Sequence, residues 1–214
     1  TTGSDGNMTV GDAGTGTLTV NSGSLSVDNT LQIGVNATGT VTQTGGSVTA
    51  GVVDLSVPGG SGSSSYSISG GSLTTTADLN VGGAGAGPAT FTQSDSGAGS
   101  QVNVDGTLRV GNVNGNATYT LTGGTLNTGT SGGSSIGDVV IGISGAGELD
   151  NSGGTQISNS IDGFTLGWDS TGTYKLTGTG SLSGAGNENI GEFGAGVLQQ
   201  GDGAGTTSNT GTSS

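Results

Sequence analysis

The residues able to do chemistry are few, and they limit the functions open to this chain. Its 214 residues include 15 acidic side chains, two basic side chains (Arg109 and Lys175), and neither histidine nor cysteine. Polysaccharide hydrolases need paired acids across a cleft, and lyases need a lysine or arginine base beside calcium-binding carboxylates. Arg109, between Leu108 and Val110, is expected to point outward and alone. We therefore expect no enzyme.

The second basic residue is expected to make a surface ion pair. Lys175 alternates with apolar Tyr174 and Leu176, so it is expected to point outward. In a stacked register it falls directly over Asp150, one repeat earlier, and such exposed pairs contribute at most about 1 kcal/mol.

Aspartates recur along the chain in a way that raises a metal hypothesis. Stacked near one corner, they could recruit a hard cation such as calcium. Their offsets from the repeat vary, and the chain has no Gly-Gly-x-Gly-x-Asp nonapeptide, so solvated corner residues are the preferred interpretation. We expect no cofactor and keep calcium as an alternative. The residues concerned are Asp28, Asp78, Asp105, Asp138 and Asp162, with Glu188 in the last repeat.

The net charge of −13 excludes attraction to nucleic acid or to an anionic membrane. No apolar run approaches the roughly 20 residues of a membrane span, so no membrane insertion is expected. The opening TTGSDGNMTV lacks the regions of a secretory signal and is expected to be a mature end. Trp168, the only tryptophan, follows Gly167 at a corner, where it could contact a sugar or a neighbouring chain or pack locally.

A short motif divides the chain into eight repeats. The pattern is apolar, any residue, apolar, glycine, and two of the eight copies are degenerate. Its fourth positions fall at 11, 34, 56, 82, 111, 142, 167 and 191, so successive copies are 22 to 31 residues apart. Such a period is typical of solenoid proteins.

Two further elements follow the motif in each repeat. The middle one alternates apolar and polar residues, as a strand with one buried face does. Its first inward position is apolar in every repeat, namely Leu18, Val41, Tyr66, Phe91, Tyr119, Leu149, Tyr174 and Leu198. The third element follows a glycine-containing turn and supplies Leu25, Val48, Leu73, Val102, Leu126, Ile157 and Leu182. The final repeat is expected to lose this column.

Three short strands per repeat, separated by glycine-rich corners, predict an all-β fold. We expect a single-stranded right-handed parallel β-helix (β-solenoid) of about eight triangular turns of 22–31 residues. It is expected to span residues 1–204, followed by a polar tail at 205–214.

The second inward position of the middle strand alternates between apolar and amide residues. It reads Val20, Gln43, Ile68, Gln93, Leu121, Asn151, Leu176 and Gln200. Because a buried amide must be hydrogen-bonded, we predict that these amides brace the corners of their own turns.

Stretches such as LQIGVNATGTVTQTGGSVTAG resemble secreted bacterial repeat proteins that accompany PEP-CTERM sorting signals, and more loosely the autotransporter-associated β-strand repeats. The likeness covers most of residues 8–203 and implies an extracellular or cell-surface β-helix, usually without enzyme activity. The end GTTSNTGTSS departs from that family, since it has no Pro-Glu-Pro signal, and this departure favours a released or assembled form.

Outward positions of the middle strands predict a flat hydroxyl-bearing face over five repeats. It runs from Thr17 and Thr19 to Thr118 and Thr120. Ice-binding solenoids have such faces, so ice binding is a minor alternative. Glu148, Asp150 and Lys175 interrupt the face in later repeats, and threonine is common on exposed strands.

Strand edges at the two ends predict self-association. With no capping helix expected, copies are predicted to join head-to-tail into a filament or matrix fibre. The residues assigned to this contact are Met8, Val10, Leu18, Val20, Ile190, Leu198 and Gln200. The alternative is a monomeric surface stalk or adhesin passenger, which would bind extracellular polysaccharide through loops 57–65 and 83–89.

Overall fold

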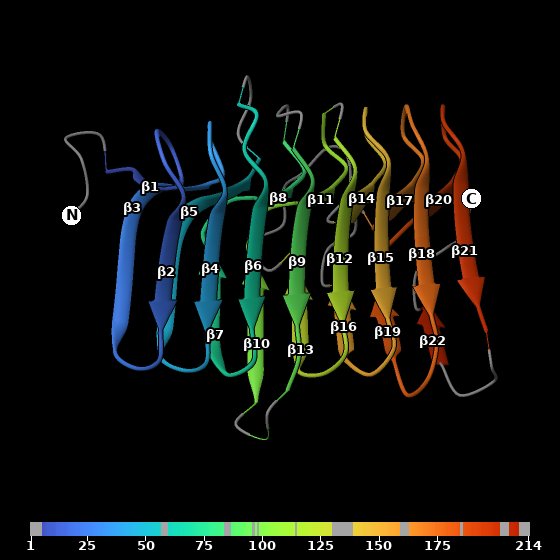
Figure 1. Ribbon diagram of the computed structural model, residues 1–214. Helices are drawn as coiled ribbons and strands as arrows, with labels where there is room; N and C mark the ends of the chain where they lie inside the picture. Colours follow the sequence, from blue (N-terminus) through green and yellow to red (C-terminus); the bar gives the residue numbers. More distant parts are fainter. Residues whose placement is uncertain are drawn as a thin grey trace.

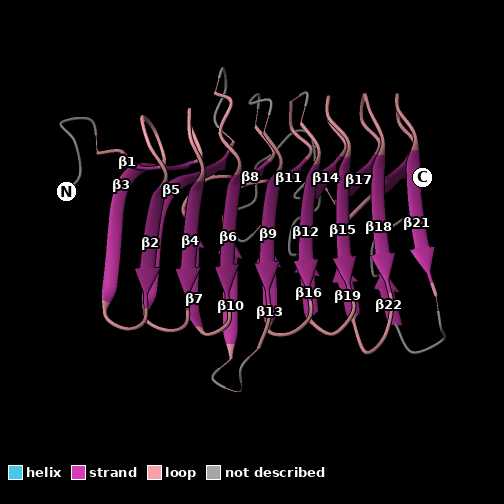
Figure 2. Cartoon of the chain, viewed as in Figure 1, coloured by secondary structure: helices cyan, strands magenta, loops and turns pink. Residues whose placement is uncertain are grey.

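The computed structural model describes residues 6–56, 60–83, 87–95, 97, 99–113, 115–129, 139–158, 163–184, 186–201 and 206–209. Within these ranges the chain is all-β and winds as a parallel β-solenoid (Figures 1 and 2). The predicted fold class is confirmed. No helix in the described ranges is long and apolar enough to cross a membrane.

One face of the solenoid is a continuous eight-stranded parallel sheet, here called the front sheet. All its strands run downward in Figure 1. They are β2 (Gly16–Val20), β4 (Gly39–Gln43), β6 (Ser64–Ile68), β9 (Ala89–Gln93), β12 (Ala117–Leu121), β15 (Gly147–Asn151), β18 (Gly172–Leu176) and β21 (Gly196–Gln200).

The other strands form two further faces. The second face lies behind the front sheet and contains β3 (Ser24–Ile33), β5 (Ser47–Leu55), β7 (Gly71–Thr75), β10 (Ser100–Val104), β13 (Thr125–Thr128), β16 (Thr155–Ser158), β19 (Ser181–Gly184) and β22 (Thr206–Asn209). The third contains β1 (Met8–Val10), β8 (Leu79–Val81), β11 (Leu108–Val110), β14 (Val139–Ile141), β17 (Phe164–Leu166) and β20 (Glu188–Ile190). The long strands β3 and β5 contribute to both faces, which joins them into one 14-stranded sheet.

The winding is right-handed and completes about seven turns. In Figure 1 the chain descends along the front sheet, rises behind it and returns across the top while advancing toward the C-terminus. The eight repeats had predicted about eight turns. Eight stacked front strands are separated by only seven steps, so counting copies overestimates the number of turns by about one.

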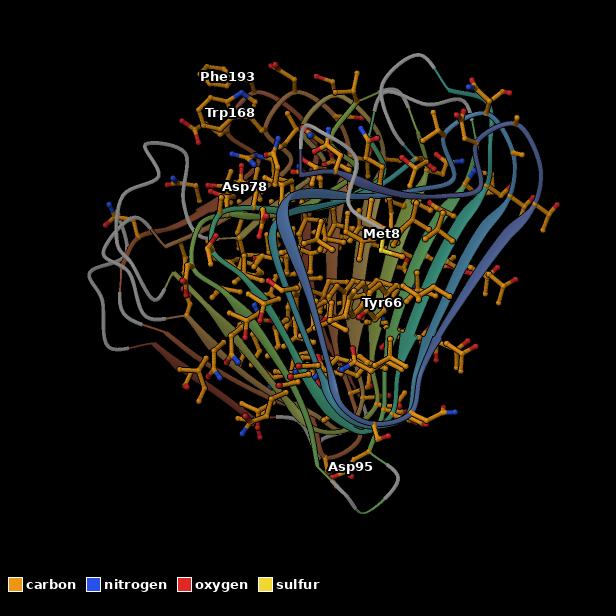
Figure 3. All side chains as sticks on the ribbon, turned by 90° about the vertical axis from the view of Figure 1, so that its left-hand side faces the viewer. Met8, Tyr66, Asp78, Asp95, Trp168 and Phe193 are labelled. Carbon is orange, nitrogen blue, oxygen red and sulfur yellow. The ribbon has the colours of Figure 1, made fainter. Side chains whose placement is uncertain are left out.

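The predicted middle-strand column fills the core from Val41 to Tyr174, while Leu18 is partly buried and Leu198 is exposed. Val41, Tyr66, Phe91 and Tyr119 pair in sequence across neighbouring strands, and each is at most 1% exposed. The aromatic rings stack with centroids 5.0 Å apart for Tyr66 and Phe91 and 4.7 Å apart for Phe91 and Tyr119. The view along the axis shows Tyr66 in a densely filled interior (Figure 3).

The predicted column on the second face is wrong at one position. In β16 it is Gln156 that pairs with Leu126 and Leu182, so Gln156 points inward and is buried while Ile157 is only partly buried. The inward residue follows Leu121 and Asn151 by the same five positions, whereas Leu182 follows Leu176 by six, and the backbone pairing sets the register. A one-residue slip would exchange the two faces of the strand.

The last turn keeps its third strand. β22 pairs in parallel with β19, and Thr207 occupies the register position of Leu182. The expectation that the final repeat loses this column holds for the apolar residue but not for the strand, because ladder pairing uses backbone groups. The parallel column therefore extends past the expected boundary at residue 204 and into the segment assigned to a polar tail.

Glycine at the corners permits close stacking of the turns, as Gly142 illustrates. Its φ of +80° is unfavourable for other residues, and a Cβ atom there would lie 2.5 Å from the Gly172 nitrogen of the following turn. The corner thus allows one backbone to rest directly on the next.

Candidate interaction surfaces

The residues assigned to self-association lie at opposite ends of the solenoid, but they differ in exposure. At the C-terminal end, Ile190 and Leu198 are 50% and 37% exposed, and Gln200 is exposed. At the N-terminal end, Met8 and Leu18 are partly exposed, whereas Val10 and Val20 are buried. Val10 and Val20 could therefore contact a partner mainly through their backbone.

Exposed large apolar side chains concentrate in the last turn. Among the described residues they are Ile190, Phe193, Val197 and Leu198. All four belong to β20, β21 or the corner between them. Exposed apolar side chains gathered in one turn indicate an interaction surface.

Both ends also carry strand edges. In the described structure, β1, β2 and the first part of β3 (24–27) each have a strand neighbour on one side only. The same holds for β20, β21 and β22 at the other end. The three edges contain 3, 5 and 4 residues at each end, in the same order around the solenoid. Such edges are templates for a further strand.

Buried amides brace their own corners, as predicted, and also connect successive turns. Gln93 Nε2 donates to the Thr125 carbonyl of the next turn at 2.9 Å, whereas its own-turn partners at Ser100 are 3.4 Å away. The next turn also provides Tyr119, whose hydroxyl donates to Gln93 Oε1 at 2.7 Å. Own-corner bonds also occur at the other amides, since Gln43 Nε2 donates to the Gly46 carbonyl at 3.4 Å and Asn151 Oδ1 accepts from the Gly154 N–H at 3.1 Å. The prediction did not include the bonds to the next turn.

The bond from the amide to a carbonyl of the next turn recurs two turns earlier and two turns later. Gln43 Nε2 donates to the Ser72 carbonyl at 2.9 Å, and Gln43 Oε1 accepts from the Tyr66 hydroxyl at 2.6 Å. Asn151 Nδ2 donates to the Ser181 carbonyl at 3.0 Å. Ser72, Thr125 and Ser181 are equivalent positions in the stacked register.

The third arrangement differs because asparagine is shorter than glutamine. The Tyr174 hydroxyl donates instead to Gln156 Oε1 at 3.0 Å and accepts from Asn151 Nδ2 at 3.3 Å. Gln156 Nε2 has no partner among the described groups, which costs about 1–3 kcal/mol. The sequence interpretation missed Gln156 because it followed apolar character, whereas the preceding turn has the five-residue spacing that places Gln156 inward.

Burial raises the pKa of all three tyrosines. The pKa of Tyr119 lies well above its usual value because the hydroxyl is fully desolvated. Desolvation also raises the pKa of Tyr66 and, against a smaller opposing effect from the Asn151 hydrogen bond, that of Tyr174. These hydroxyls stay protonated, so they can donate to the amides.

Arg109 points outward, as predicted, but it is not alone. Its guanidinium lies 2.5 Å from Asp78 Oδ2 and donates to Asn80 Oδ1 at 3.2 Å. Asn80 Nδ2 in turn donates to Asp54 at 2.6 Å. Partial burial raises the pKa of Asp54 despite that hydrogen bond. Arg109 is thus held in structural contacts by Asp78 and Asn80.

Lys175 pairs with Glu148 instead of Asp150. The register places Lys175 opposite Asp150 as predicted, yet Nζ lies 2.8 Å from Glu148 Oε1, two residues before Asp150. A long side chain reaches this diagonal neighbour easily. The hydrogen bond that Lys175 donates to Glu148 raises the pKa of Lys175. Both side chains are more than one-third exposed, so the contribution to stability is small.

The described aspartates do not form a cation ladder. Asp78 Oδ1 accepts the Thr107 backbone N–H, and its other oxygen pairs with Arg109. Asp78 directly precedes β8, and the matching residue before β11 is Thr107. Asp105 lies two residues earlier and is out of register with Asp78. Asp28 lies inside β3, at the register irregularity between Val27 and Thr30. Asp138 and Asp162 lie outside the described residues, within which no three candidate ligands gather.

Trp168 belongs to an aromatic pair at the corner beside the third face. Its ring meets Phe193 of the next turn edge-on, with centroids 5.4 Å apart, and the Phe193 N–H donates to the Trp168 carbonyl at 2.9 Å. Figure 3 shows both rings projecting from the outer corner. Phe193 is 71% exposed and was missed by the sequence interpretation, although it follows Gly191 by two positions at the matching corner.

The hydroxyl face is in register over five strands of the front sheet. Thr17, Thr40, Ser65, Thr90 and Thr118 are stacked, as are the residues two positions later. Glu148 and Asp150 of β15 end the array. A shallow trough of about 280 Å³ lies where the hydroxyl array ends, at the start of β12, β15 and β18. Its lining includes Asn116, Thr118, Glu148, Thr171 and Thr173.

Comparisons of the chain with protein-family models, with curated proteins and with solved structures gave no match.

Proposed function

We propose that this chain is a non-enzymatic structural protein whose copies join head-to-tail into a filament or fibre outside the cell. The observation that carries the proposal is the concentration of exposed apolar side chains on the last turn, beside three strand edges that match those of the first turn. Backbone pairing and apolar burial would act together at such a junction.

The extracellular location rests on the family resemblance and on composition. A chain dominated by glycine, with no cysteine and 8% charged residues, suits a surface or matrix rod whose thin core is built turn by turn. Its two basic residues are held in ion pairs on the outside, which supports a role without catalysis.

Electron microscopy and sedimentation of the purified chain test the proposal. We expect unbranched fibres much longer than one copy. Ile190→Lys should abolish them, because it places a charge on the exposed apolar end of the solenoid. The matched control is Ile157→Lys, which changes an outward, partly buried isoleucine in the middle of the rod and should leave fibres intact. Dispersed short rods from the unmodified chain would contradict the proposal.

The alternative function is a monomeric stalk that binds polysaccharide. The pair of half-buried Trp168 and exposed Phe193 favours it, because aromatic faces with a polar surround bind sugar rings. The loops first assigned to this role, 57–65 and 83–89, lie partly outside the described residues. Short rods that bind polysaccharide, and lose this binding on Trp168→Ala, would support the alternative. Ice binding by the hydroxyl face stays a minor prediction.

A further inference from the structure

The front sheet alternates between two kinds of turn, and the amides make this alternation directional. Amide turns contain Gln43, Gln93, Asn151 or Gln200 at the second inward position, and aliphatic turns contain Val20, Ile68, Leu121 or Leu176. Each of the first three amides donates to a carbonyl of the aliphatic turn that follows it. An amide turn is thus built to receive an aliphatic turn on its C-terminal side.

The two ends of the solenoid match the two sides of this contact between an amide turn and the aliphatic turn that follows it. The first turn is aliphatic, with Val20, and the last is an amide turn, with Gln200 exposed. We propose that copies meet in a single register, in which β21 of one copy pairs with β2 of the next and Gly196 lies opposite Gly16. This inference rests on the proposed head-to-tail function and names its junction.

The register follows from the pairing inside the chain. Gly16, Gly39, Gly172 and Gly196 occupy the same position of the front strand. Continuing the stack places Leu198 over Leu18 and Gln200 over Val20 of the next copy. Ser24 of that copy is equivalent to Ser72, because both pair with Ser47. The Ser24 carbonyl would therefore accept from Gln200 as the Ser72 carbonyl accepts from Gln43.

Backbone groups at the corners repeat in the same order. The Gly34 N–H donates to the Val10 carbonyl of the preceding turn, and the Gly191 N–H to that of Leu166. At the junction, the N–H of Gly11 would donate to the Ile190 carbonyl of the preceding copy. On the second face, β22 and the first part of β3 would pair through Thr206 and Ser24.

The junction differs from the internal interfaces in one buried contact. Leu18 stands where Tyr66, Tyr119 and Tyr174 lie in the other aliphatic turns, so no tyrosine hydroxyl meets Gln200. The contact between copies lacks a hydrogen bond that Gln43 and Gln93 both receive from the following turn. It should therefore separate more readily than adjacent turns within one copy.

Cysteine pairs test the register, because the chain contains no cysteine of its own. In the proposed register, Gln199 and Thr19 of the next copy are direct neighbours on the outside of the front sheet. Neighbouring parallel strands are about 4.8 Å apart, within the range that a disulfide bridges. The variant with Thr19→Cys and Gln199→Cys should form a disulfide-linked ladder under mild oxidation.

The matched control moves one cysteine by two residues on the same face. Combining Thr17→Cys with Gln199→Cys separates the Cα atoms by about 8 Å, beyond disulfide reach, so ladders should be about tenfold weaker. Equal ladders from both variants, or a stronger ladder from the control, would overturn the register while leaving head-to-tail assembly intact. If sedimentation shows no assembly by the unmodified chain, both the register and the proposed function fail.

Discussion

The Gln93 side chain shows how a polar group is kept inside a thin apolar column. Its nitrogen and oxygen are hydrogen-bonded to the next turn by Thr125 and Tyr119, so no polar atom of the amide is left unpaired. A buried tyrosine and a buried amide thus satisfy one another. The pairing holds only while the tyrosine keeps its proton, which links the core to pH.

We predict that alkaline solution unfolds the protein. The pKa of each tyrosine is raised in the folded chain, whereas in the unfolded chain it lies near 10. Above pH 10 the unfolded chain binds fewer protons, so stability is complete below that pH and falls as pH rises. Three tyrosines give a loss of about 4 kcal/mol per pH unit.

Denaturant titrations from pH 8 to 12 measure this slope. Tyr174→Phe should reduce it by about one-third, because one of the three titrating groups is removed. Tyrosine absorbance that changes near pH 10 while the chain stays folded would show that the hydroxyls are accessible to solvent.

At the scale of the element, most of the fold could be predicted because each feature has its own sequence pattern. Strands alternate apolar and polar residues, corners contain glycine, and turns repeat the apolar-any-apolar-glycine motif. The alternating pattern located the front strands, and the positions of Tyr66, Phe91 and Tyr119 in the core are confirmed. The choice of Ile157 is wrong because apolar character does not reveal the register, which places Gln156 between Leu126 and Leu182. The partners of Arg109 and Lys175 were missed because long side chains reach diagonal neighbours, which sequence spacing alone does not specify.

Replacing a corner glycine by alanine should have one of two costs in stability, depending on whether the added Cβ atom would meet backbone of the next turn or open space. Gly23 and Gly142 both have positive φ, near +77° and +80°, but only Gly142 lies against backbone of the next turn. Gly23→Ala should cost about 1–2 kcal/mol from backbone strain alone. Gly142→Ala should cost at least about 2 kcal/mol more, because the added methyl overlaps the Gly172 nitrogen.

Urea unfolding of the two variants compares these costs directly, with Gly14→Ala as the reference, since that glycine has open space and no positive φ. Equal losses at positions 23 and 142 would show that turns can separate enough to admit a methyl group.

At the scale of the whole molecule, the net charge of −13 opposes the proposed assembly. Glu192 follows the corner Gly191 as Asp12 follows Gly11, so the proposed register brings these two carboxylates close together. The sequence interpretation did not predict this pair, because opposed charges appear only once a junction register is defined.

Assembly should therefore become stronger as salt is added. Raising the ionic strength from about 0.01 M to 0.15 M shortens the screening length from about 30 Å to 8 Å, which weakens repulsion between copies. The critical concentration, measured by sedimentation, should fall. Glu192→Gln should reduce this salt dependence, and a critical concentration that rises with salt would exclude charge repulsion as the barrier.

The ion-paired positions of Arg109 and Lys175 have a consequence for the durability of the protein. A protease that cuts after basic residues has two target bonds in all 214 residues, and both lie inside hydrogen-bonded strands, β11 and β18. Digestion of the native rod by such an enzyme would require a turn to unwind first. A material that must persist among secreted trypsin-like enzymes would gain from this scarcity of cleavage points.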